Sequence, residues 1–135
     1  MMLPVRPTVH ISAPVPAEVE EAVCRDFELV EAPRGADGIV AMLTVTVDDA
    51  YLDAAGPQLR VVANYAVGVN NVDLQAARRR GVVVANTPDV LTGATAELAL
   101  TLMLSLLRRV TEGDRFVRRR EPWQFSLEFM LGERL

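Results

Sequence analysis

The sequence predicts an α/β fold in which a parallel sheet carries helices on both faces. Short apolar segments alternate with segments of helical periodicity through the first 91 residues, a pattern that is typical of βαβ units. Residues 38–43 form an unbroken apolar run, as expected for a central parallel strand that is covered on both sides. These observations favour an open sheet over a helical bundle or an all-β domain.

The first half of the chain contains three predicted strands and one helix. Residues 8–11 form a short strand that ends before Pro14. Residues 16–25 have helical character because Val19, Ala22 and Val23 share one face. Residues 27–30 alternate apolar and polar side chains, as a strand near a sheet edge does, and residues 38–43 supply the next strand.

In the second half of the chain, predicted helices and strands alternate more regularly. Residues 47–55 form a short helix that Gly56 and Pro57 end. Two further strands at residues 60–64 and 82–85 flank a helix at residues 73–80, and a long helix runs from Thr92 to about Arg119. The chain therefore divides into a sheet domain at residues 1–91 and a helical part with its tail at residues 92–135.

The connection at residues 31–37 is too short to hold a crossover helix. Seven residues reach about 23 to 25 Å when fully extended, and passing a strand of about 17 Å and two strand spacings uses most of that length. Either this loop is stretched across the end of the sheet, or the strand at residues 27–30 is displaced or absent. An antiparallel strand would also need only a short connection.

Composition excludes several classes of function. All 14 basic residues are arginine, so Schiff-base chemistry and a P-loop lysine are excluded. With His10 and Cys24 as the only residues of their types, we expect no metal site and no internal disulfide, and the lone cysteine suits a reducing, cytoplasmic compartment. The apolar run at residues 98–107 is far below the roughly 20 residues that span a bilayer, so we expect no membrane segment.

Two arginine triplets could be taken for nucleic-acid contacts. Residues 78–80 precede Gly81, and residues 118–120 end the long predicted helix. Cations in a last helical turn stabilise the negative end of the helix dipole, and the net charge of the chain is −4. We therefore favour the helix-capping interpretation and expect no nucleic-acid partner.

The most informative segments are residues 61–73 and 84–92. Each is an apolar run that ends in a turn of Gly, Asn or Pro, which places polar backbone at the carboxyl end of a strand, where open α/β sheets bind ligands. Gly68 lets backbone approach a ligand closely, and consecutive amides there can cradle a carboxylate. A tight left-handed turn without a ligand is the alternative.

These two segments resemble the D-isomer-specific 2-hydroxyacid dehydrogenases, especially the glyoxylate and hydroxypyruvate reductase branch. The likeness continues through residues 95–99, 112–118 and 121–123, and covers at least residues 38–132. The resemblance implies a flavodoxin-like substrate domain with five parallel strands, a small 2-oxo or 2-hydroxy acid as substrate, and NAD or NADP as cofactor.

The resemblance also implies roles for individual residues. Val67 and Gly68 match the turn whose main-chain amides bind the substrate carboxylate, and Leu43 matches a residue that borders the substrate, although it could equally be a core leucine. Thr95 matches a threonine that contacts the cofactor near its nicotinamide half, or it caps the long helix. Asn70 stands where relatives commonly have aspartate, and we expect it to cap the helix that follows.

No residue of this chain matches the family's catalytic groups. The family uses a histidine with a carboxylate partner and an arginine from its cofactor domain and the segment after it, whereas His10 lies on the first predicted strand. The eight glycines never fall two apart, so the chain contains no G-x-G turn for a dinucleotide. We therefore expect no catalytic residue and no activity for this chain alone.

Two hypotheses of different classes follow. The chain is either the amino-terminal part of an NAD(P)-dependent 2-hydroxyacid dehydrogenase, or a noncatalytic flavodoxin-like module for protein binding or oligomerisation. The helix at residues 92–119 carries Leu100, Met103, Leu104 and Leu107, interrupted only by small hydroxyl residues between residues 98 and 107. This pattern favours the first hypothesis and predicts a homodimer formed through that helix.

Overall fold

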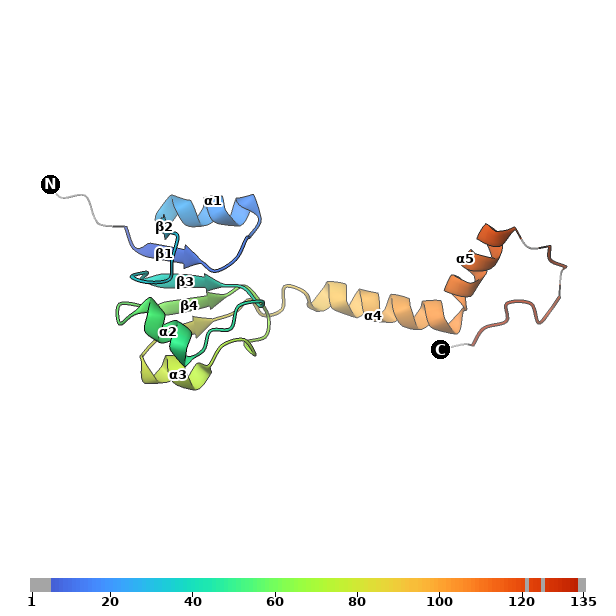
Figure 1. Ribbon diagram of the computed structural model, residues 1–135. Coiled ribbons are helices and arrows are strands. Elements are labelled where there is room, and N and C mark those ends of the chain that lie inside the picture. The colour runs from blue at the N-terminus through green and yellow to red at the C-terminus, as the bar shows by residue number, and fades with distance from the viewer. Residues whose placement is uncertain (1–5, 121, 125, 134–135) are drawn as a thin grey trace. The chain divides into compact units, whose positions relative to one another are not determined.

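A computed structural model describes residues 6–120, 122–124 and 126–133, and the chain forms two compact units, Met1–Val90 and Leu91–Leu135. The first unit holds a five-stranded sheet in the order β2-β1-β3-β4-β5 (Figure 1). Its strands are β1 (Thr8–Ile11), β2 (Glu28–Val30), β3 (Gly38–Ala41), β4 (Val61–Asn64) and β5 (Val83–Ala85). Its helices are α1 (Ala17–Asp26), α2 (Asp49–Ala55) and α3 (Leu74–Arg79).

All four strand pairs are parallel, and the strand order is that of flavodoxin-like sheets. The crossover through α1 moves one way along the sheet, whereas those through α2 and α3 move the other way. Right-handed crossovers therefore place α1 on the opposite face from α2 and α3. The predicted α/β fold with helices on both faces is confirmed.

The edge strand β2 resolves the question about residues 31–37. It pairs in parallel with β1, with Leu29 opposite Val9, so the displaced, absent and antiparallel alternatives are wrong and the loop is stretched across the sheet end. The loop suffices because β2 has three residues and β1 four, roughly 10 to 13 Å of strand instead of about 17 Å.

Asp37 anchors the end of that loop to the start of β1. Its Oδ2 accepts hydrogen bonds from Thr8 N at 2.8 Å and from Thr8 Oγ1 at 3.0 Å, and its own N–H donates to Thr8 O at 2.9 Å. The two hydrogen bonds from Thr8 hold the pKa of the Asp37 carboxyl below its ordinary value. This contact fixes where the stretched loop enters β3.

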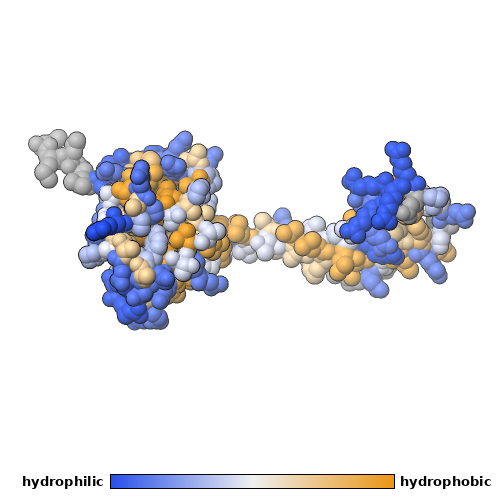
Figure 2. Space-filling model, viewed as in Figure 1, coloured by the Kyte–Doolittle hydropathy of each residue, from blue (hydrophilic) through white to orange (hydrophobic). Residues whose placement is uncertain are grey.

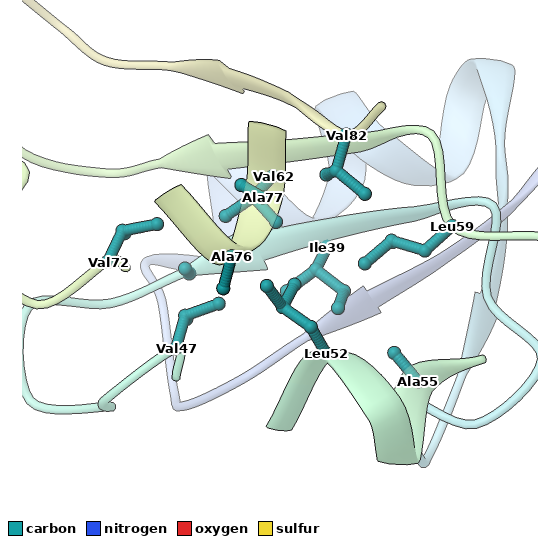
Figure 3. Close-up of a cluster of buried hydrophobic side chains, with 11 residues drawn as sticks. Ile39, Val47, Leu52, Ala55, Leu59, Val62, Val72, Ala76, Ala77 and Val82 are labelled. Atoms are coloured by element: carbon teal, nitrogen blue, oxygen red, sulfur yellow. The ribbon is translucent and has the colours of Figure 1, made fainter. Parts of the chain in front are cut away.

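The hydrophobic core lies between the sheet and the pair α2 and α3 (Figure 3). Ile39 and Val62 from the central strands meet Leu52 of α2, and all three are at most 1% exposed. Asp48 caps α2 by accepting from Tyr51 N, and Asp73 caps α3 by accepting from the amides of Gln75 and Ala76. The expectation that Asn70 caps this helix is therefore wrong, because the capping residue is Asp73, three residues later.

The arginines at the end of α3 have partners in the neighbouring helix. Arg80 Nη1 lies 2.7 Å from Asp49 Oδ1, Arg80 Nη2 lies 2.5 Å from Asp53 Oδ1, and Arg79 Nη2 lies 2.6 Å from Asp49 Oδ1. These hydrogen bonds lower the pKa of Asp49 and raise that of Arg80. Arg79 and Arg80 thus connect α3 to α2 by ion pairs and also end their own helix. The sequence alone did not reveal this connection.

The second unit contains α4 (Thr92–Leu107) and α5 (Val110–Arg119). One continuous helix to about Arg119 was predicted, but the helix breaks at Arg108 and Arg109, where Arg109 has a left-handed backbone with φ 54°. The carbonyl of Leu107 accepts a hydrogen bond from Glu133 N at 2.8 Å, so the returning tail occupies an acceptor that a continuing helix would use.

Aromatic contacts hold the returning tail against α5. The ring of Phe129 lies 5.1 Å from that of Phe116 and 5.8 Å from that of Trp123, measured between centroids. Figure 2 shows hydrophobic residues along α4, and no residue of α4 or α5 is buried. Among the described residues, no helix combines the length and apolar character needed to cross a membrane.

Candidate functional site

The candidate site lies at the carboxyl edge of the sheet, where the loops after β3, β4 and β5 follow adjacent strands. Leu43 belongs to the loop after β3, Val67 and Gly68 to the loop after β4, and Asn86 and Thr87 to the loop after β5. In open α/β sheets this edge is the usual place for a ligand. The prediction that Gly68 lies just past a strand is confirmed, because β4 ends at Asn64.

Three consecutive carbonyl groups of the β4 loop accept hydrogen bonds from the protein. Ala66 O accepts from Thr87 N at 2.9 Å, and Val67 O accepts from Asn86 Nδ2 at 2.8 Å. Gly68 O accepts from Asn64 Nδ2 at 2.7 Å. Each of these hydrogen bonds therefore fixes the orientation of one peptide plane, and the three planes are successive.

The amides of the same peptide planes remain available. In a trans peptide the N–H points away from the carbonyl, so the bonds to Ala66 O, Val67 O and Gly68 O also set the directions of the N–H groups of Val67, Gly68 and Val69. Within the described part of the chain, none of these three N–H groups has a hydrogen-bond acceptor. Consecutive amides with fixed orientation and no acceptor form a site suited to an anion.

Gly68 leaves room beside these amides. Its φ is not in the left-handed region, in which Gly35, Gly56 and Gly81 lie, so the alternative of a left-handed turn is wrong. A Cβ atom at Gly68 would meet no heavy atom within 4 Å, whereas one at Gly38 would lie 3.2 Å from Val61 Cγ1. Neither backbone strain nor crowding by the chain accounts for this glycine, and the space above it is open to a ligand.

Leu43 is 59% exposed, so the alternative that it is a core leucine is wrong. It lies between two residues whose carbonyls are anchored, because Met42 O and Val45 O both accept from Asn71 Nδ2, at 3.3 and 3.1 Å. Asn71 itself belongs to the segment after Gly68. The hydrogen bonds of this asparagine hold the two loops together and leave the Leu43 side chain free at their edge.

Thr95 lies in the other unit, in the first turn of α4, where it is exposed. Its N–H donates to Leu91 O at 2.9 Å, and Leu91, which precedes the helix, makes no side-chain cap. The interpretation of Thr95 as a helix cap is therefore wrong. Its predicted contact with a cofactor stays a prediction.

His10 has a structural contact on the first strand. Its half-buried ring donates from Nδ1 to Val30 O of the neighbouring strand at 3.2 Å, and the prediction that His10 lies on the first strand is confirmed. In the described ranges, no group of three or more His, Cys, Asp or Glu side chains could hold a metal ion.

Sequence reasoning missed three asparagines that build the site: Asn64, Asn71 and Asn86. A signal was available for Asn64 and Asn86, because the sequence V-V-A-N occurs at residues 61–64 and again at residues 83–86. The asparagine is the last residue of β4 in the first copy and directly follows β5 in the second, and both asparagines donate to carbonyls of the loop after β4.

The fold and this loop define a flavodoxin-like domain in which a turn with unbonded amides lies at the carboxyl edge of the sheet. Sequence comparison identifies the family: the catalytic domain of the D-isomer specific 2-hydroxyacid dehydrogenases matches residues 13–129. The chain belongs to this family.

Individual relatives support this family assignment. A glyoxylate reductase of Thermococcus kodakarensis is 43% identical over 84% of this chain, and one of Thermococcus gammatolerans is 53% identical over 67%. The chain spans 38% and 27% of their respective lengths, so it corresponds to well under half of these relatives.

Solved structures have the same fold. A 2-hydroxyacid dehydrogenase of Ketogulonicigenium vulgare superposes with a TM-score of 0.81 at 28% identity, over 97% of this chain and 45% of that one. An NADPH-dependent glyoxylate/hydroxypyruvate reductase of Sinorhizobium meliloti, solved with NADP and malonate, superposes with a TM-score of 0.73 at 32% identity, over 91% and 44%.

Proposed function

We propose that this chain supplies the carboxylate-binding part of the substrate site of an NAD(P)-dependent 2-hydroxyacid dehydrogenase, and that it does not reduce a 2-oxo acid by itself. The observation that carries the proposal is the β4 loop, in which the carbonyls of Ala66, Val67 and Gly68 are bonded while the N–H groups of Val67 and Gly68 have no acceptor within the described residues. Two amides that bind one carboxylate would orient a small 2-oxo acid without a charged side chain.

Glyoxylate or hydroxypyruvate is the proposed substrate. The relatives that match this chain are glyoxylate reductases, and one similar structure is a glyoxylate/hydroxypyruvate reductase. The exposed side chain of Leu43 would border such an acid. A compact 2-oxo acid suits an open loop that offers two amides and one apolar side chain.

The nicotinamide cofactor does not fit the residues present. Thr95 is the one candidate contact, and the chain has no pair of glycines spaced as a dinucleotide turn requires. A nicotinamide would supply the hydride, and a histidine that this chain does not match would supply the proton. The role of these residues is thus to bind and orient the carboxylate, and we assign no step of the transfer to them.

Titration of the isotope-labelled chain with glyoxylate, followed by amide NMR, tests the carboxylate site. We expect the amide signals of Val67 and Gly68 to shift, and Gly68→Ala to weaken the response because its methyl group enters the open space. Gly93→Ala is the matched control, since Gly93 also has no atom within 4 Å of a Cβ position and no positive φ. Equal responses in both variants and the wild type would place the anion elsewhere.

An activity assay tests the second half of the proposal. The purified chain, mixed with glyoxylate and NADH or NADPH, should leave the absorbance of the reduced nicotinamide constant. Turnover on the order of 1 s⁻¹ or faster, which is ordinary for an enzyme, would contradict the claim that the catalytic groups are missing.

We also propose that the chain forms a homodimer through residues 92–119. Leu100, Met103 and Leu104 of α4 are each about half exposed, at 53, 47 and 46%, and each large apolar side chain left in water forfeits roughly 1.5 to 3 kcal/mol of burial. Sedimentation should therefore show at least a dimer, and a stable monomer would refute this. The cytoplasmic location predicted from Cys24 stays a prediction.

The noncatalytic module remains the competing hypothesis, because an apolar helix also suits protein binding. It predicts self-association or partner binding through α4 with no response of Val67 and Gly68 to glyoxylate. The NMR titration separates the two hypotheses.

A further inference from the structure

The side chains of Asn64 and Asn71 form a reciprocal amide pair behind the candidate site. Asn64, the last residue of β4, is 1% exposed. Its Nδ2 donates to Asn71 Oδ1 at 3.1 Å, and its Oδ1 accepts from Asn71 Nδ2 at 3.0 Å. The two side chains therefore bind each other through two hydrogen bonds.

The orientation of both amides is determined by backbone carbonyls. Asn64 Nδ2 also donates to Gly68 O, and Asn71 Nδ2 also donates to Val45 O and Met42 O. A carbonyl oxygen only accepts hydrogen bonds, so each nitrogen has to face its carbonyl, and a flipped amide would place oxygen against oxygen. The pair consequently has one arrangement.

The pair joins two loops that follow neighbouring strands. Asn64 holds the carbonyl of Gly68 in the loop after β4, while Asn71 holds the carbonyls on both sides of Leu43 in the loop after β3. Asn71 is itself fixed by its backbone, because its carbonyl accepts from Val47 N at 2.7 Å. A change at either asparagine would remove side-chain hydrogen bonds that join the Gly68 loop to the Leu43 loop.

We propose that Asn64 and Asn71 are a positioning pair, which fixes the spacing between the carboxylate-binding amides at Val67 and Gly68 and the apolar border at Leu43. This inference rests on the proposed function. The pair does not touch the substrate. It sets the geometry of the loops that do, and because both side chains are neutral amides it adds no negative charge beside a carboxylate.

The test uses Asn71→Asp in the full chain, since aspartate keeps the shape and one acceptor but loses the donors to Met42 O and Val45 O. Asn70→Asp is the matched control, because Asn70 is exposed and adjacent and receives the same change of charge. We expect Asn71→Asp to weaken the glyoxylate response of the Val67 and Gly68 amides by about tenfold or more, as small displacements in a binding site do. Asn70→Asp should change it far less.

A second readout needs no ligand. Amide hydrogen exchange and ¹⁵N relaxation should show residues 67–69 and Leu43 becoming more mobile in Asn71→Asp, with the amides of β3 and β4 unchanged. If the wild type does not respond to glyoxylate, the proposed function fails, and this readout still decides whether the pair positions the loops. Unchanged mobility and unchanged binding in Asn71→Asp would overturn the inference.

Asn71→Ser is a second variant for the case in which Asn71→Asp does not fold. Its hydroxyl can donate to one carbonyl at most, so we expect an intermediate mobility of the two loops. If both variants at position 71 unfold while Asn70→Asp folds, the pair supports the whole sheet and not the loops specifically, and the positioning role is rejected.

Discussion

The two units of this chain differ in how they use apolar side chains. In Met1–Val90, the core residues from Val9 to Val82 are buried between strands and helices. In Leu91–Leu135, no residue of α4 or α5 is buried, and Leu102 and Leu106 are 61 and 80% exposed. The first unit completes its own core, whereas the second has an apolar helix that needs another surface to cover it.

Truncation of a core residue should have the largest effect and should act on the first unit alone. Leu52→Ala removes a side chain that is 1% exposed and packs against Ile39 and Val62, so it should lower the free energy of unfolding by about 2 to 5 kcal/mol. Chemical denaturation measures this. Leu106→Ala is the matched control in α4 and should change it by less than about 0.5 kcal/mol. Equal losses would mean that the two units share one core.

Changes on the outer surface of α4 should act on association instead. Leu100 and Leu104 are four residues apart and share a face of the helix, so Leu100→Gln combined with Leu104→Gln should dissociate the proposed homodimer, at roughly 1.5 to 3 kcal/mol for each side chain. Sedimentation velocity at several concentrations checks this, with Thr101→Gln as control. A dimer that survives the double change would show that α4 is not its interface.

The Asp37–Thr8 contact gives a pH dependence that is confined to the first unit. Because the folded-state pKa of Asp37 is lowered, its contribution to stability is present above the unfolded pKa of about 3.9 and is lost as the pH falls through the lower folded value. Asp37→Asn should therefore lower the melting temperature at pH 7 and make less difference towards pH 2. Asp26→Asn, at the exposed end of α1, is the control, and a pH-independent difference would contradict this account.

The smallest effect is expected at Tyr51, whose hydroxyl is buried and has no hydrogen-bond partner among the described residues. Burial raises the pKa of this phenol, and an unpaired buried hydroxyl contributes nothing to stability. Tyr51→Phe should leave the free energy of unfolding unchanged within about 0.5 kcal/mol or raise it slightly. A clear loss in thermal denaturation would mean that the hydroxyl has a partner.

Strand and helix positions in the first unit followed closely from the sequence. The strand predicted at residues 8–11 has the observed bounds of β1, and the one predicted at residues 60–64 differs from β4 by a single residue. These elements were predictable because their periodicity reports burial directly. The break at Arg109 was not, because it depends on the tail that returns to Leu107 O.

The candidate site was predictable in its position but not in its construction. Gly68 was identified because a glycine follows a predicted strand, and the resemblance to the family added Val67; the structure places both at the carboxyl edge of the sheet. Asn71 could not be identified, because its partners Met42 and Val45 lie 29 and 26 residues earlier in the chain. A distant hydrogen bond leaves no periodic pattern in the sequence.

The sequence by itself determined the parallel α/β fold and the turn at Gly68, since hydrophobic patterning and local turn chemistry depend on neighbouring residues. The family followed from the resemblance of several ordered segments of the sequence. The tertiary structure decided which peptide carbonyls of that turn are bonded and which amides remain available. It also decided how seven residues suffice to join β2 to β3. Both depend on the spacing of adjacent strands, which brings together groups that are far apart along the chain.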